Sequence, residues 1–183
     1  MRHLLGPLLI LCVVALAVTT LASALAWWLE PERRTARTLA RLLGAPPEAL
    51  VLAAPRSQGA GLRLDEGRIA VVRGVGDPGL VYDLSELIGV ELIFDGQVSA
   101  RMFRGEARRP LDQIAPDARR VMLRMVFDDV RDPEFELELL SPTDLDARDP
   151  PHPQGAVQEA RRWYSRLEAV LRRAGGSDGL QGR

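Results

Sequence analysis

The chain has one cysteine, two histidines, and no lysine or asparagine among its 183 residues. Because Cys12 stands alone inside an apolar run, neither a disulfide within the chain nor a cysteine-based zinc site exists. His3 lies beside the N-terminus and His152 in the segment PPHPQG, so they offer little for a triad, an imidazole base or a metal–histidine cluster. These absences remove most catalytic chemistry and most metal sites from consideration.

An excess of either charge is also missing. The 24 basic and 25 acidic residues leave a net charge of −1 and a pI near 6.2, which gives no bulk attraction to nucleic acid. Every basic residue is an arginine, a bias that GC-rich codon usage explains better than phosphate binding does. We therefore expect no nucleic-acid partner.

The first thirty residues are the longest apolar stretch. No charged side chain occurs from Leu4 to Leu29, and about twenty apolar residues suffice to cross a bilayer as a helix. Trp27 and Trp28 end the stretch, where indole rings favour the headgroup layer, and a basic flank follows. We predict that residues 1–30 form a transmembrane helix that acts as a signal anchor.

The same stretch has a second interpretation, a cleaved signal peptide. Arg2 supplies a basic start, and a small-x-small exit occurs at 22–24 or 24–26. Cleavage after Ala24 or Ala26 would release an exported envelope protein. The length and the tryptophan pair favour the anchor, and the arginines behind it place the C-terminal domain on the cytoplasmic side of the membrane by the positive-inside rule.

Residues 31–47 are predicted to connect the anchor to the domain. ERRTARTLARLL (32–43) has helix-forming residues, Gly44 is a natural stop, and two prolines follow. The arginines of this connector helix are positioned to contact anionic lipid, at about 1 kcal/mol each near the surface.

After residue 47 the hydrophobic period changes from helical to alternating. Alternation predicts short strands at 49–54, within a hairpin at 61–74, and at 80–82, 90–94, 97–104, 121–127 and 134–140. Asp95-Gly96 predicts a tight turn between two of them. The cluster GVGDPG (74–79) is a turn; it lacks the Gly-Lys-Ser/Thr that follows in a phosphate-binding loop.

Six carboxylates crowd into RMVFDDVRDPEFELELL (124–140). In the predicted strand 134–140, Glu134, Glu136 and Glu138 share one face opposite the apolar side chains and form a solvent-facing row near Arg124. The remaining three, Asp128, Asp129 and Asp132, fall in the connecting turn. We predict no catalytic, cofactor-binding or metal-binding residues. The alternative is a weak carboxylate metal site or a hydrolase centre at 128–132, although the spacing is not that of a twelve-residue calcium loop.

The chain closes with an amphipathic helix over 156–174, in which Trp163 lies centrally on the apolar stripe as a core residue. Gly175-Gly176 is expected to end it, leaving 175–183 as a disordered tail. The predicted fold class is mainly β (α+β). We expect a strongly bent antiparallel sheet, or partly open barrel, of about seven strands, capped by the C-terminal helix and preceded by the transmembrane helix.

The segments GLRLDEGRIAVV, VYDLSELIGVELIFDG, VMLRMVFDDVRDPEFELELL and AVQEARRWYSRLEAVLRR resemble bacterial pleckstrin-homology-like (PH-like) domains. The likeness covers about residues 60–173, within a predicted PH-like domain at 48–174, and rests on structural turns. It implies a non-enzymatic binding or scaffolding module of a single-span membrane protein, without cofactor and with an unidentified protein partner. Residues 65–68 are not the basic loop of lipid-binding members, which argues against phosphoinositide recognition.

Overall fold

The computed structural model describes residues 13–21, 23, 30–53, 57–106, 117–147 and 150–178. From residue 30 onward, its helices and strands are α2 (Pro31–Leu42), β1 (Ala49–Ala53), β2 (Gln58–Arg63), β3 (Arg68–Val72), β4 (Leu80–Asp83), β5 (Leu87–Phe94), β6 (Gln97–Phe103), β7 (Val121–Phe127), β8 (Glu134–Leu140), α3 (Pro142–Leu145) and α4 (Pro153–Asp178). Residues 13–21 are also helical.

The eight described strands form two antiparallel sheets. Sheet A has the order β1-β2-β3-β4 and sheet B the order β6-β5-β7-β8. The α+β class, the antiparallel pairing and the C-terminal helix are therefore confirmed. The single bent sheet of about seven strands is wrong in detail, because β4 and β5 follow each other without pairing and the chain passes from one sheet to the other between them.

The tight turn between β5 and β6 forms as its sequence predicts. Asp95 and Gly96 have φ values of 49° and 82°, the left-handed pair that a two-residue hairpin requires. The Asp95 carboxylate also accepts hydrogen bonds from the backbone N–H groups of Arg119 and Arg120, at 2.9 and 2.8 Å. The same residue that turns the hairpin therefore fixes the start of β7.

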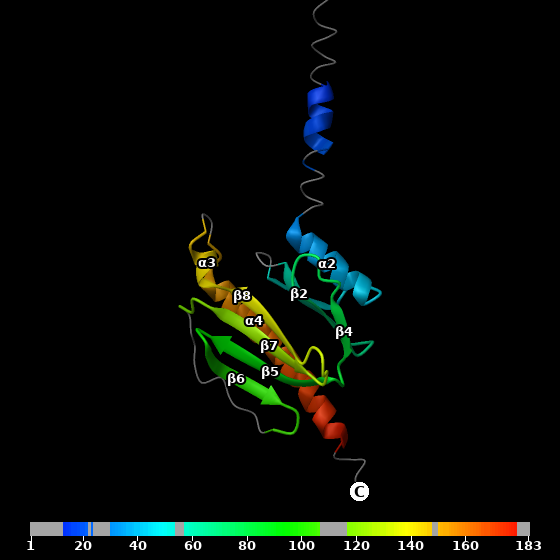
Figure 1. Ribbon diagram of the computed structural model, residues 1–183, viewed down its shortest axis with the longest axis vertical. Helices are drawn as coiled ribbons and strands as arrows, with labels where there is room; N and C mark the ends of the chain where they lie inside the picture. Colours follow the sequence, from blue (N-terminus) through cyan, green and yellow to red (C-terminus); the bar gives the residue numbers. More distant parts are fainter. Residues whose placement is uncertain are drawn as a thin grey trace, which may run out of the picture.

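The main core lies between the inner faces of the two sheets and α4. In Figure 1, α4 runs behind sheet B. Trp163, Tyr164 and Leu167 of α4 are fully buried and join a cluster with inward-facing residues of both sheets, such as Leu62 and Leu123. The prediction that Trp163 is a core residue is confirmed.

A second, smaller core lies on the opposite face of sheet A. Here Leu39 of α2 and its C-cap Leu43, which are 0% and 1% exposed, pack against Ala70 and Val72 of β3. The predicted connector helix is therefore part of the domain. Figure 1 shows α2 lying along the sheet that contains β2 and β4.

Two further predictions concern the chain ends. The predicted transmembrane span lies largely outside the described residues, and within them no helix combines the length and hydropathy needed to cross a bilayer. At the other end α4 continues to Asp178, beyond the expected stop at Gly175-Gly176, because glycine disfavours a helix without breaking it as proline does. The rest of the predicted tail, 179–183, lies outside the described residues. The short helix α3 was not predicted; Ser141 and Asp144 begin it with a reciprocal capping box.

Candidate functional site

The acidic turn between β7 and β8 does not gather its carboxylates around one point. Asp129 Oδ1 accepts a hydrogen bond from the Arg131 N–H at 2.8 Å, which holds the pKa of that carboxyl below its ordinary value. Asp132 instead pairs with Arg73 Nη1 at 2.9 Å. Among the described residues, no group of three histidine, cysteine or acidic side chains is placed to hold a metal ion. Nothing in this geometry favours the metal or hydrolase alternative at 128–132.

The turn connects the two sheets. Tyr82 of β4 donates from its hydroxyl to the Asp132 carbonyl at 3.2 Å, and Arg73 also donates to the Glu134 carbonyl at 3.3 Å. The Tyr82 ring stacks on Phe127 with 4.0 Å between centroids. Burial, reinforced by the negative charges of Asp129 and Asp132, raises the pKa of Tyr82 to about 12. The acidic turn is therefore a structural contact between sheets.

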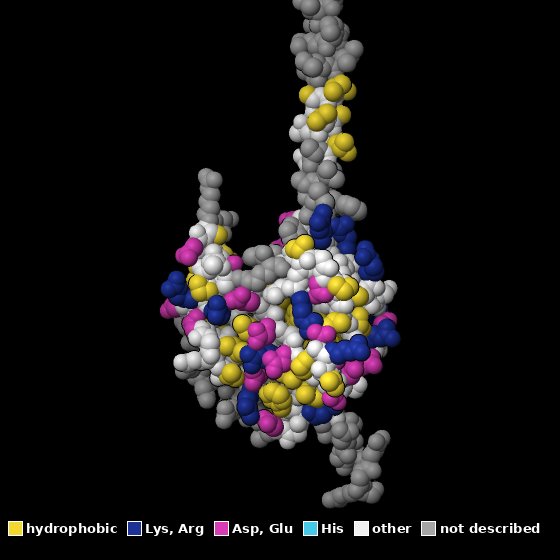
Figure 2. Space-filling view, viewed as in Figure 1, with side chains coloured by type: hydrophobic (Ala, Val, Ile, Leu, Met, Phe, Trp, Pro, Cys, Tyr) yellow, Lys and Arg dark blue, Asp and Glu magenta, His cyan; other side chains and the backbone are white. Residues whose placement is uncertain are grey.

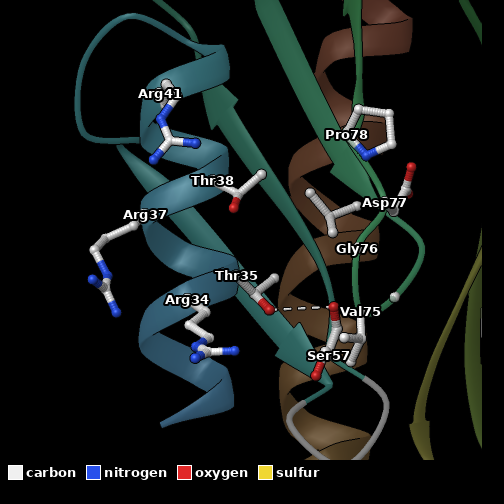
Figure 3. A pocket seen from close by; sticks show the side chains of 12 residues that line it. Arg34, Thr35, Arg37, Thr38, Arg41, Ser57, Val75, Gly76, Asp77 and Pro78 are labelled. Atoms are coloured by element: carbon white, nitrogen blue, oxygen red, sulfur yellow. Dashed lines mark hydrogen bonds between the residues drawn. The ribbon is translucent and has the colours of Figure 1, made fainter. Parts of the chain in front are cut away.

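A groove of about 470 Å³ opens on the other side of sheet A, between α2 and the β3–β4 loop. Figure 3 shows Arg34, Thr38 and Arg41 on α2, with the loop residues 75–78 across from them. Ser57 closes one end, where its carbonyl accepts a hydrogen bond from Thr35 Oγ1 at 3.2 Å. The buried side chain of Val72 also lines the groove.

Glycines allow the wall of this groove to form. A Cβ on Gly61 of β2 would lie 3.2 Å from Leu43 Cδ1, and one on Gly59 would lie 3.0 Å from Thr35 Cγ2. A Cβ on Gly79 would approach Leu42 Cδ1 to 2.5 Å, and its φ of +78° is one that side-chain-bearing residues rarely adopt. The helix and the loop therefore flank the groove closely because all three positions lack a side chain.

The β3–β4 loop is held in shape by its own acidic residue. Asp77 accepts hydrogen bonds from the backbone N–H groups of Arg73 and Gly79, the latter at 3.1 Å, and its own N–H donates to the Gly74 carbonyl at 3.2 Å. Val75 at the tip of the loop is 86% exposed. An ordered loop therefore presents an apolar side chain at the mouth of the groove.

The charges around the groove are mainly positive. Three arginines and one carboxylate line it, and both carboxylate oxygens of Asp77 already accept backbone hydrogen bonds. Arg37 donates from Nε to the Arg33 carbonyl at 3.0 Å and extends away from the loop in Figure 3. In the described part of the chain, no carboxylate lies within ion-pair distance of Arg34 or Arg41. Figure 2 shows the basic side chains gathered along α2. The groove is therefore suited to a small anion.

Sequence reasoning identified both sides of this groove without joining them. It assigned the arginines to a connector helix and GVGDPG to a turn. The available signal was Gly59 and Gly61, alternate glycines that place a side-chain-free stripe on one face of β2. Such a stripe marks a face against which another backbone packs closely.

No family model, curated protein or solved structure matches this chain. The resemblance to PH-like domains therefore stays a prediction.

Proposed function

We propose that the protein is a membrane-anchored, non-enzymatic interaction module, with its PH-like domain held against the cytoplasmic face of the membrane. The observation that carries the proposal is the packing of α2. This helix begins at Pro31, two residues after the apolar stretch ends at Leu29, and buries Leu39 and Leu43 in the domain.

This packing makes the tether short. Two residues of extended chain span about 7 Å, so the domain lies within that distance of the end of the anchor. A domain on a long flexible linker would sample many orientations, whereas this one presents a restricted set of faces to the bilayer. A fixed orientation suits a module that displays a binding surface at a membrane.

The orientation follows from the basic flank. Arg33, Arg34, Arg37 and Arg41 all follow the apolar stretch, and the positive-inside rule places such a flank in the cytoplasm. The non-enzymatic part of the proposal is supported by the scarcity of cysteine and histidine and by the use of the acidic turn as a contact between sheets.

The test combines membrane fractionation with topology reporters on the full chain. We expect the protein to stay in the membrane pellet after alkaline carbonate extraction. A C-terminal alkaline phosphatase fusion should be inactive and a C-terminal fluorescent protein fusion bright. An active phosphatase fusion would reverse the topology. A soluble mature chain whose N-terminal sequence begins at Leu25 or Trp27 would replace the anchor with the exported alternative.

A further inference from the structure

Two arginines of the groove lie on one side of α2. Arg34 and Arg41 are seven residues apart, about 10 Å along the helix axis, and Thr38 lies between them with its hydroxyl on the same side. Guanidinium groups bind phosphate oxygens through paired N–H donors, and a hydroxyl adds a further donor. The side of α2 facing the loop thus offers donors suited to a phosphate ester.

An apolar tip stands across from these cations. Val75 is 86% exposed beside a glycine-rich turn, and Val72 is buried along the groove. A small soluble anion makes no favourable contact with an exposed apolar side chain at the mouth of its site. A phospholipid would contact this side chain, since its phosphate is joined through glycerol to acyl chains that lie next to it on the hydrocarbon side.

The position of α2 sets the height of the groove above the membrane. Arg34 is three residues, or about 5 Å, beyond the start of α2 at Pro31, and the headgroup region of one leaflet is about 5–7 Å thick. Added to the tether of about 7 Å, this places Arg34 within about 12 Å of the end of the anchor, from where its long side chain reaches back to the headgroup layer. Arg41, about 15 Å from the start of the helix, reaches the same layer when α2 tilts toward the membrane plane.

From these observations we propose that the groove between α2 and the β3–β4 loop binds the phosphate of an acidic phospholipid headgroup, with Arg34 and Arg41 as its cationic contacts and Val75 inserting beside it. The depth argument rests on the proposed function. The charge, the shape and the exposed valine are independent of it. The Asp77 carboxylate, held by the backbone of its own loop, orders the wall and does not compete for the arginines.

The test uses the full-length chain, labelled with ¹⁵N, in zwitterionic detergent micelles. Three probes are titrated: dihexanoyl phosphatidylglycerol, dihexanoyl phosphatidylcholine and glycerol 3-phosphate. We expect saturable shifts of the Val75 amide and the arginine Nε–H signals with phosphatidylglycerol alone. Arg34→Gln combined with Arg41→Gln should weaken this binding about twenty-five-fold, about a factor of five for each arginine.

Matched controls separate binding at the groove from nonspecific attraction between arginines and the acidic lipid. Arg166→Gln with Arg172→Gln removes the same charge from exposed positions on α4 and should change the affinity less than about twofold. Val75→Asp should weaken binding about tenfold by placing a carboxylate at the mouth of the groove. Val130→Asp, at a 101% exposed valine in the β7–β8 turn, should not. Thermal unfolding of each variant verifies that the fold is retained.

Several outcomes would overturn the proposal. Equal losses in the α2 and α4 double variants would indicate nonspecific attraction. Equal binding of phosphatidylcholine would remove the role of net charge, and glycerol 3-phosphate binding as tightly as the lipid would assign the groove to a soluble phosphate ester. A chain that fractionates as soluble yet binds phosphatidylglycerol with these variant effects refutes the anchor alone. A membrane-bound chain without these effects refutes the groove site alone.

Discussion

The outer faces of the two sheets are opposites. On sheet A, the outer face of β2 and β3 carries Gly59, Gly61, Ala70 and Val72 and lies beneath α2. On sheet B, the equivalent face carries charged side chains, with Arg124 of β7 between Glu91 of β5 and Glu136 of β8. Figure 2 shows acidic and basic side chains, with apolar ones between them, over sheet B.

This difference shows how each sheet excludes or admits a helix. Small side chains let the α2 backbone approach closely enough for its leucines to reach the strands. The charged side chains on the outer face of sheet B would cost too much to desolvate beneath an apolar helix face. The outer face of sheet B therefore stays in contact with water. The small-residue face of sheet A therefore binds α2, and the charged face of sheet B remains without a covering helix among the described residues.

The prediction with the largest expected loss of stability concerns the main core, to which both sheets contribute. Trp163→Ala should lower the free energy of unfolding by about 3–5 kcal/mol, since among the described residues it removes the largest fully buried side chain of the main core. Urea unfolding of the full chain in detergent micelles measures the loss. Arg166→Ala, on an exposed position of the same helix, should stay within about 0.5 kcal/mol. A loss below about 1 kcal/mol at Trp163 would refute the assignment of α4 to the core.

The second prediction concerns only the packing of α2 on the outer face of sheet A. Leu39→Ala should cost about 2–4 kcal/mol locally, because Leu39 is buried between α2 and β3 and not in the main core. Hydrogen exchange should quicken in α2 while α4 stays protected. Leu64→Ala, at a half-exposed leucine, is the matched control and should leave both helices unchanged. Equal quickening in α4 would mean that the two cores unfold as one.

The third test concerns the contact that joins the sheets. The pKa of Tyr82 is raised from 10 to about 12 mainly by burial, so the folded protein holds this proton where the unfolded chain has lost it. The stabilisation is complete below pH 10 and disappears as the pH rises from 10 to 12, by roughly 2 kcal/mol. Urea unfolding between pH 9 and 12 measures the slope.

Tyr82→Phe provides the control for that slope. Without the hydroxyl, the alkaline loss attributable to this residue should vanish, while stability at pH 8 should drop by about 1 kcal/mol through loss of the hydrogen bond to the Asp132 carbonyl. An unchanged slope in this variant would assign the alkaline transition to other groups.

The charged face of sheet B was predictable from sequence, whereas the covered face of sheet A was not. The alternation of apolar and polar residues predicted strands at 121–127 and 134–140, with the bounds that the structure shows. It also placed the glutamates of 134–140 on the outer side of the sheet. The rule works best in β8, where Glu134, Glu136 and Glu138 alternate with apolar side chains; the outer face of β7 carries Met122 and Val126 beside Arg124. Both faces of β3 are apolar, so alternation alone does not reveal that α2 covers one of them.

Two other features escape a local pattern. The alternation in 134–140 predicts Leu139 inside, but a register shift near Val121 and Met122 buries Leu140 more fully. The groove joins residues 34–41 to residues 74–78, and only the tertiary packing of α2 brings them together. The chemistry of each wall was readable, but their apposition depends on the long-range fold.

The smallest test sharpens the contrast between the two outer faces. Arg124 and Glu136 are directly paired across β7 and β8, with Nη2 and Oε1 at 2.8 Å, and both side chains reach solvent. A double-mutant cycle with Arg124→Gln and Glu136→Gln should give a coupling of about 0.3–0.8 kcal/mol that shrinks in 1 M salt, because water and ions screen exposed pairs. A coupling above about 2 kcal/mol that ignores salt would mean that this face is covered, as the outer face of sheet A is, and that the two faces do not differ in their access to water.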